Sequence, residues 1–246
     1  MRVSAIVVSH GSAAELTDSL PALASQVDEL VVVGNIPGSV PEGVEAIENR
    51  EPLGFSANIN LGLRLTDGEA VVIANPDAIA RPGAVATLRS FMEEHPRCGV
   101  AGPSMVFPDG RPQPSRRRFP TVGGTLVRRT PLRRLIGQAH HLHLDEPPPT
   151  APVQVDWMLG GFLLLRRAML DELGGFDEGF RLYGEDIDLQ YRAMRAGWER
   201  WYVPAAVVQH IHHAETDHRF LTRRTLWHWR GIARFVRKHP ERLRAL

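Results

Sequence analysis

The sequence contains a single cysteine, Cys98, among its 246 residues. One cysteine excludes an intramolecular disulfide framework and any zinc site built from several cysteines, and it fits a reducing cytoplasm. Apolar runs are short as well: residues 3–8 are too few for a signal peptide, and no run approaches the ~20 residues of a membrane-spanning helix. We therefore expect a cytoplasmic protein that meets any membrane from the side.

Several catalytic signatures are also missing. The sequence has no Gly-x-Gly-x-x-Gly after a strand, no Gly-x-x-x-x-Gly-Lys loop and no Gly-x-Ser-x-Gly elbow. Their absence argues against a nicotinamide dehydrogenase, a P-loop kinase and an α/β-hydrolase. The formal net charge is only +1, which provides no overall field for binding nucleic acid.

The composition is that of an ordinary globular protein, with 43% hydrophobic and 23% charged residues. Positive charge is concentrated in arginine clusters at 116–118, 128–129, 133–134 and 223–224. Such clusters suit an anionic substrate or a membrane surface.

Hydrophobic periodicity alternates between strand and helix from the N-terminus onward. It predicts strands at 3–8, 29–33, 70–74 and 201–208, and helices at 15–23, 56–65, 83–94 and 167–173. This alternation indicates an α/β fold with a twisted, mostly parallel sheet flanked by helices. Such sheets bind ligands at the carboxyl ends of their strands, where the sequence places Ser9 and residues 75–77.

Two adjacent carboxylates, Glu185 and Asp186, follow Gly184 where a loop is predicted to become a helix. Acidic residues are common in a first turn because the exposed amides and the helix dipole favour negative charge. An acidic helix start without chemistry and a catalytic pair are both consistent with this pattern. In either case we expect the helix start to hold the pKa of Asp186 low.

Asp77 lies in a turn directly after the predicted strand at 70–74. Aspartate often forms turns without further function, but a carboxylate at this edge also suits a divalent cation that bridges two phosphates. His210 would be a second ligand, and imidazole suits Mn²⁺ better than Mg²⁺. A zinc site formed by the histidines at 210–213 with Glu215 is an alternative, as is a solvated histidine-rich turn.

The last segment, from residue 222, is basic and aromatic. One helical face would carry Leu226, Trp229, Ile232, Phe235 and Val236. Trp229 and Phe235 then pack on the core while the arginines and lysines face outward, or the segment lies on an anionic membrane surface.

Seven segments carry a resemblance that covers nearly the whole chain. They are Ala-Ile-Val-Val-Ser-His-Gly at 5–11, Leu-Gly-Phe-Ser-Ala-Asn-Ile-Asn-Leu-Gly at 53–62, Ile-Ala-Asn-Pro-Asp at 73–77, Gly-Gly-Phe-Leu-Leu-Leu-Arg-Arg at 160–167, Gly-Gly-Phe-Asp-Glu-Gly-Phe at 174–180, Tyr-Gly-Glu-Asp-Ile-Asp-Leu at 183–189 and Ala-Gly-Trp at 196–198. In this order they resemble a family 2 glycosyltransferase, an inverting enzyme with the GT-A fold, and in particular the bacterial rhamnosyltransferases.

The resemblance implies a role for each matching residue. Asp186 would be the catalytic base and Glu185 would orient the base or the acceptor. Asp77 would hold a Mg²⁺ or Mn²⁺ ion on the donor diphosphate, with His210 near the metal. The positions implied in substrate binding are Val8, Ser9, Gly54, Phe55, Asn58, Asn60, Asn75, Asp77, Gly161 and Trp157.

The resemblance also implies substrates and an organisation. The donor would be a dTDP- or UDP-sugar, and the acceptor a glycan or a polyprenyl-linked sugar at the inner face of the plasma membrane. A GT-A domain at 1–215 would comprise a nucleotide-binding half at 1–105 and an acceptor half at 106–215, with a long loop at 108–152. A helical tail would follow at 216–246, and peripheral membrane contact and a homodimer are left open.

The chain departs from the family pattern at two positions. Gly34 and Asn35 follow the second strand where an aspartate usually contacts the nucleoside, and Pro52 replaces an asparagine before Leu-Gly-Phe. Two other function classes remain as alternatives: a sugar nucleotidylyltransferase and a non-catalytic nucleotide-sugar-binding protein.

Overall fold

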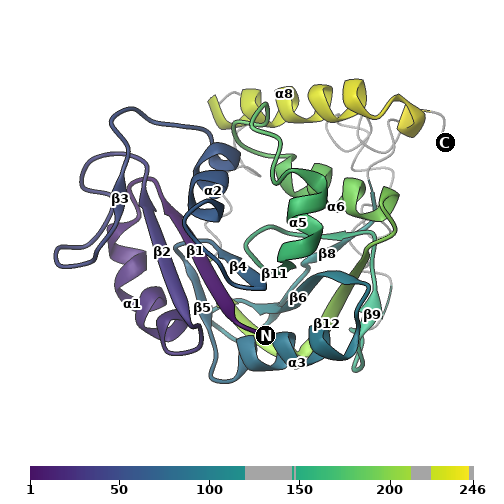
Figure 1. The fold of residues 1–246 in the computed structure, drawn as a ribbon, viewed down its shortest axis with the longest axis horizontal. Helices are drawn as coiled ribbons and strands as arrows, with labels where there is room; N and C mark the ends of the chain where they lie inside the picture. Colours follow the sequence, from purple (N-terminus) through teal and green to yellow (C-terminus); the bar gives the residue numbers. More distant parts are fainter. Residues whose placement is uncertain (120–145, 147, 212–222, 244–246) are drawn as a thin grey trace.

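The computed structural model describes residues 1–119, 146, 148–211 and 223–243 (Figure 1). A ten-stranded sheet contains β1 (Val3–Ser9), β2 (Glu29–Gly34), β3 (Ile47–Glu48), β4 (Ala70–Ala74), β5 (Ala78–Ala80), β6 (Cys98–Val106), β7 (Pro112–Gln113), β9 (Val153–Gln154), β11 (Phe162–Arg166) and β12 (Glu199–His210). A second, two-stranded sheet pairs β8 (Arg116–Arg117) with β10 (Trp157–Met158).

The helices are α1 (Ala13–Ala24), α2 (Phe55–Leu63), α3 (Ala84–Glu94), α5 (Arg167–Leu173), α6 (Glu185–Arg195) and α8 (Arg223–Lys238), followed by a 3₁₀ helix, η3 (Pro240–Leu243). Among the described helices, none is long and apolar enough to cross a membrane.

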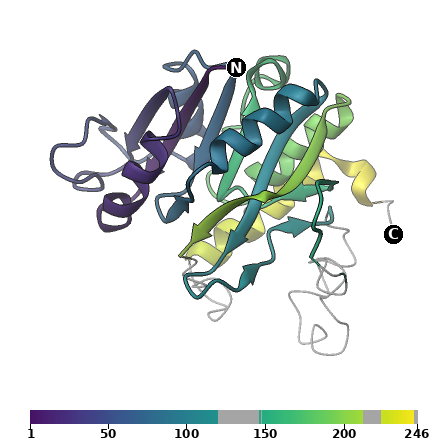
Figure 2. The same cartoon turned by 90° about the horizontal axis from the view of Figure 1, so that it is seen from below.

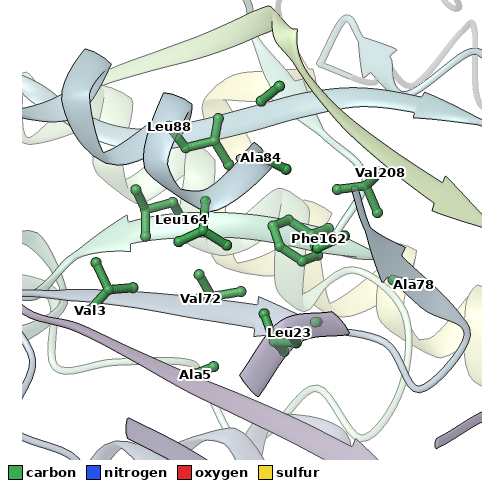
Figure 3. Packing of buried hydrophobic residues seen from close by; sticks show 14 of the residues in the cluster. Val3, Ala5, Leu23, Val72, Ala78, Ala84, Leu88, Phe162, Leu164 and Val208 are labelled. Atoms are coloured by element: carbon green, nitrogen blue, oxygen red, sulfur yellow. The ribbon is translucent and has the colours of Figure 1, made fainter. Parts of the chain in front are cut away.

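Alternation along β1 distributes its side chains between two cores. Val3, Ala5 and Val7 belong to a cluster with residues of α1 and α3, and Figure 3 shows its packing between α3 and the sheet. Ile6 and Val8 belong to the opposite cluster with residues of α2, α5 and α6. A strand's side chains point alternately to its two faces, so both faces of this sheet carry apolar residues. Helices cover both faces (Figures 1 and 2).

The sheet order is β3-β2-β1-β4-β11-β6-β12-β5. The first four strands run parallel, as predicted, and β12 is parallel to β6. In contrast, β11 runs antiparallel to both β4 and β6, and β5 runs antiparallel to β12. The sheet is therefore mixed, with a wholly parallel N-terminal part.

Helix α8 corrects part of the prediction for the tail. Phe235 is buried at 3% exposure, as expected, but Trp229 is 38% exposed and is not among the buried residues of the core. Arg230, Arg237 and Lys238 are exposed, as expected, whereas Arg234 is half-buried; Arg234 and Lys238 each form an ion pair with Asp177. The buried face instead contains Gly231, Phe235 and His239, at helical spacing.

Candidate active site

The turn after β4 places Asn75 and Asp77 at the carboxyl end of a fully buried strand. The Asn75 amide donates to the Gly161 carbonyl at 2.9 Å, and the Asp77 carbonyl accepts from the Ile211 amide at 3.1 Å. These bonds attach the turn to the residues that precede β11 and follow β12. The two predicted positions therefore lie where three strands meet.

His210, the last residue of β12, is 5% exposed and faces this turn. Its Nε2 lies 3.3 Å from Asp77 Oδ1 and 3.5 Å from Asn75 Nδ2. Its Nδ1 lies 3.0 Å from Gln113 Oε1, which only accepts, so Nδ1 carries a proton. The Nε2 atom and the Asp77 carboxylate therefore converge on one point at the end of β4.

Gly161 allows this approach because it has no side chain. A Cβ at this position would lie 2.9 Å from Met105 Cε and 3.3 Å from His210 Nε2. A larger residue would displace either the methionine or the imidazole.

Asp186 is held by Gly160, the residue that precedes Gly161. The Gly160 amide donates to Asp186 Oδ2 at 3.1 Å, and the Ile187 amide donates to Oδ1 at 2.9 Å. Consecutive residues, Gly160 and Gly161, thus contact the acidic pair and the Asn75–His210 group respectively. The structure brings together the two centres that the sequence separates by more than a hundred residues.

The prediction for the pKa of Asp186 is wrong. Burial raises this pKa above its ordinary value, and this effect exceeds the opposing effect of the Gly160 and Ile187 amides and of the Arg117 charge. The helix start orients the carboxylate but does not dominate its electrostatics. A raised pKa makes Asp186 a stronger base than an exposed aspartate.

Glu185 is also buried, at 9% exposure, at the start of α6. Burial, and then the charge of Asp186, raise its pKa to about 8. Its Oε2 has no hydrogen-bond partner in the described part of the chain. The pKa values of both carboxyls are therefore raised, and Asp186, whose two oxygens are each oriented by a backbone amide, is the one placed to accept a proton.

The predicted nucleotide-side residues form a second group around β1 and α2. Val8 packs in a core cluster, and Ser9, which is fully buried, donates from Oγ to the Ser39 carbonyl at 2.5 Å. Asn58 is also fully buried, donates to the Gly54 carbonyl at 3.1 Å and accepts from Asn49 at 2.6 Å. The polar atoms of Ser9 and Asn58 therefore form hydrogen bonds within the protein and hold the surrounding backbone in place.

Asn35, where the chain departs from the family pattern, organises this region. Its Oδ1 accepts from the Leu53 amide at 2.8 Å and from Asn49 Nδ2 at 2.9 Å. Its Nδ2 lies 3.1 Å from the Leu53 carbonyl and 3.0 Å from His10 Nδ1. The amide is fully engaged, so Asn35 fixes the loop before α2 and the ring of His10.

Other predicted residues bind neighbouring backbone. The Phe55 amide donates to the Arg181 carbonyl at 2.8 Å. This bond links the Gly54–Phe55 turn to the loop that precedes Glu185 and Asp186. Asn60 Nδ2 donates to the Phe176 carbonyl at 2.8 Å, and Trp157, which is 8% exposed, donates from Nε1 to the Arg118 carbonyl at 2.9 Å.

Sequence reasoning missed Gln113, Asn49 and Gln190. Gln190 holds α6 to β10 through two hydrogen bonds with the Met158 backbone, of 2.8 and 2.7 Å. Isolated amides of this kind have no sequence signature. His212, His213 and Glu215, which the zinc alternative requires, lie outside the described residues, and within those residues no group of three or more metal-ligating side chains gathers.

Comparison with known proteins gives close relatives. The chain is 37% identical over 148 residues to an N-acetylglucosaminyl-diphospho-decaprenol L-rhamnosyltransferase of Mycobacterium tuberculosis (strain CDC 1551 / Oshkosh), which covers 57% of this chain and 46% of that protein. It is 40% identical over 83 residues to the rhamnosyltransferase WbbL of Escherichia coli (strain K12), covering 33% and 31%. The chain thus spans about half or less of the length of these relatives.

Solved structures share its fold. A structure of GalNAc-T7 with UDP, GalNAc and Mn²⁺ superimposes with a TM-score of 0.68 at 15% identity, over 96% of this chain and 48% of that one. The mannosyltransferase PcManGT from Pyrobaculum calidifontis, in complex with GDP-Man and Mn²⁺, gives 0.63 at 19%, over 96% and 64%. The fold is GT-A, as predicted.

The family model described as "Glycosyltransferase like family 2" matches residues 23–228. Because this match covers most of the sequence and agrees with the relatives and the fold, the chain belongs to glycosyltransferase family 2.

Proposed function

We propose that this chain is an inverting glycosyltransferase that moves a sugar, with rhamnose the first candidate, from a nucleotide diphosphate to a glycan or lipid-linked acceptor. One observation carries the proposal: Gly160 binds Asp186 while Gly161 lies against His210 and binds Asn75. A base and a group suited to a metal-bound diphosphate therefore flank one dipeptide.

The residues at the end of β4 fit a divalent cation. A carboxylate oxygen and an imidazole lone pair 3.3 Å apart repel each other unless a proton or a cation lies between them. Two protein ligands are few, which suits Mg²⁺ or Mn²⁺ because these ions complete their coordination with water and substrate phosphates. Asp77 and His210 would hold the ion, and the imidazole favours Mn²⁺. Bound there, the ion would stabilise negative charge on the departing diphosphate.

Asp186 would act on the acceptor. As the acceptor oxygen forms a bond to the anomeric carbon, Asp186 takes the hydroxyl proton, and the bond to the diphosphate breaks on the opposite face. Configuration at the anomeric carbon is inverted. Glu185, whose pKa is raised to about 8 by burial and by the charge of Asp186, would orient Asp186 or the acceptor.

The relatives support the choice of substrates. The name of the mycobacterial relative specifies rhamnose as the transferred sugar and a diphospho-decaprenol as the acceptor lipid. We propose a dTDP- or UDP-sugar as donor and a polyprenyl-linked or glycan acceptor. A cytoplasmic location at the inner face of the membrane stays a prediction.

The outer face of α8 would bring the enzyme to such an acceptor. Trp229 is 38% exposed and Arg230 is exposed beside it, an aromatic and a basic group suited to the surface of an anionic bilayer. This is a peripheral contact, from the side of the membrane.

Product analysis with a panel of nucleotide sugars tests the proposal. Release of a nucleoside diphosphate with a transferred sugar of inverted anomeric configuration is the expected result. Release of pyrophosphate instead identifies a nucleotidylyltransferase, and binding of a nucleotide sugar without turnover identifies a non-catalytic protein. Either result overturns the proposal.

A further inference from the structure

Helix α8 lies directly against the chain segment that leads into the acidic pair (Figure 1). Gly231 is buried, and a Cβ there would overlap the carbonyl oxygen of Tyr183. Tyr183 is two residues before Glu185, so α8 touches the backbone from which the catalytic helix starts. Only glycine at position 231 permits so close a contact.

The contacted backbone is unusual. Tyr183 has φ of 70°, the single positive value among non-glycine residues in the described ranges, and Gly184 follows with φ of 96°. A non-glycine residue in the left-handed region persists only where its surroundings hold it there. The turn that orients Glu185 and Asp186 therefore depends on neighbouring elements.

Lys238, at the end of α8, connects the loop before this turn to helix α6. Its Nζ lies 2.7 Å from Asp177 Oδ2, in the loop before the turn, and 2.9 Å from Asp188, in the first turn of α6. Hydrogen bonds from Lys238 and Arg234 outweigh the effect of burial on Asp177 and hold the pKa of this carboxyl well below its ordinary value. One ammonium thus bridges two carboxylates on either side of Tyr183.

Asp188 has no exposed surface, so its charge requires partners. Arg192 Nε donates to Oδ2 at 2.8 Å, and His239 Nε2 lies 2.8 Å from Oδ1. Because Asp188 follows Asp186 by two residues in the same helical turn, any shift of Asp188 moves the base as well. Gln190 fixes α6 to β10, whereas Lys238 fixes it to the preceding loop.

We propose that Lys238 is a positioning residue for sugar transfer: by bridging Asp177 and Asp188 it holds the left-handed turn and keeps Asp186 aligned with the acceptor. This inference rests on the proposed function for its catalytic consequence. The structural part, the bracing of residues 177–188 by α8, stands independently.

The test compares Lys238→Met with Arg237→Met, a matched control at the neighbouring exposed arginine, which forms no ion pair with the described residues. Transfer kinetics are measured in the presence of Mn²⁺, at a temperature well below the midpoint of thermal unfolding of both variants. We expect Lys238→Met to lower kcat on the order of 10-fold to 100-fold, the effect of a misplaced catalytic group, with the donor KM unchanged. Arg237→Met keeps the wild-type kcat.

Two further measurements separate positioning from general destabilisation. Amide hydrogen exchange of the peptide covering 177–188 becomes faster in Lys238→Met, while exchange in β1 and β4 stays as in the wild type. The double variant Asp177→Asn with Lys238→Met should lose little more kcat than either single variant, because both changes break the contact between Lys238 and Asp177.

Equal kcat in Lys238→Met and Arg237→Met overturns the positioning role, as do additive losses in the double variant. Two results overturn the bracing: faster exchange throughout the protein, or no increase in the exchange rate of residues 177–188. If the wild-type chain transfers no sugar, the proposed function fails, and hydrogen exchange alone still decides the bracing.

Discussion

At the scale of single residues, the site depends on Gly160 and Gly161. One amide holds the Asp186 carboxylate, and the missing side chain of its neighbour leaves room for His210. Asp77 and His210 then converge within 3.3 Å. These contacts explain why a small dipeptide lies between two groups with different proposed tasks, proton transfer and diphosphate binding.

Burial of Glu185 gives a prediction about stability. Its pKa is raised from 4.5 to about 8 in the folded protein, so between these pH values the unfolded chain releases a proton that the native state keeps. The free energy of unfolding therefore falls as pH rises from about 4.5 to 8 through this residue. Urea unfolding across this range measures the slope, and Glu185→Gln should flatten it. An identical slope in the variant contradicts the assignment.

Much of the site could be predicted from residue types in sequence context. Asp77 after a buried strand and Glu185–Asp186 at a helix start are local patterns, and both lie where those patterns indicate. The raised pKa of Asp186 could not be predicted, because it depends on burial by distant segments. Gln113 and Asn35 act through contacts with residues distant in sequence, which no local pattern encodes.

At the scale of elements, β4 and α5 have the bounds that periodicity predicts, because both are regular segments with clear apolar spacing. Strand β6 was missed, although it lies at the centre of the sheet. Gly99, Gly102 and Pro103 lower its β propensity, and pairing with β11 and β12 overrides this.

Helix α8 gives a prediction at this scale. Phe235 is 3% exposed and packs against Tyr191, with ring centroids 5.6 Å apart. Phe235→Ala should lower the free energy of unfolding by on the order of 3 kcal/mol, from lost burial and the cavity left behind. Denaturant unfolding compares it with Trp229→Ala, which removes an exposed ring and should cost far less. Equal losses would mean that α8 is not packed through Phe235.

At the scale of the whole molecule, helices on both faces of a mixed sheet leave the carboxyl ends of β1, β4 and β12 to form the site, and α8 covers the acidic helix (Figures 1 and 2). This arrangement places a stabilising face and an exposed face on one helix. The inner face contacts residues 177–188, and the outer face carries Trp229.

The outer face predicts binding to anionic vesicles. Vesicles of phosphatidylglycerol and phosphatidylcholine should bind the protein at low salt and release it as salt screens the basic groups. Trp229→Ala with Arg230→Ala should weaken sedimentation with these vesicles, and neutral vesicles serve as the control. Binding that neither salt nor the double change affects would contradict a contact through α8.

The most direct measurement is the rate of sugar transfer by Asp186→Asn, with donor affinity determined separately by equilibrium binding. The account predicts that kcat falls on the order of 100-fold to 10,000-fold, the usual contribution of general base catalysis. Donor affinity should stay unchanged, because the Asp77 and His210 side chains are retained. A smaller fall in kcat, with the variant folded and the donor bound, would contradict the assignment of Asp186 as the base.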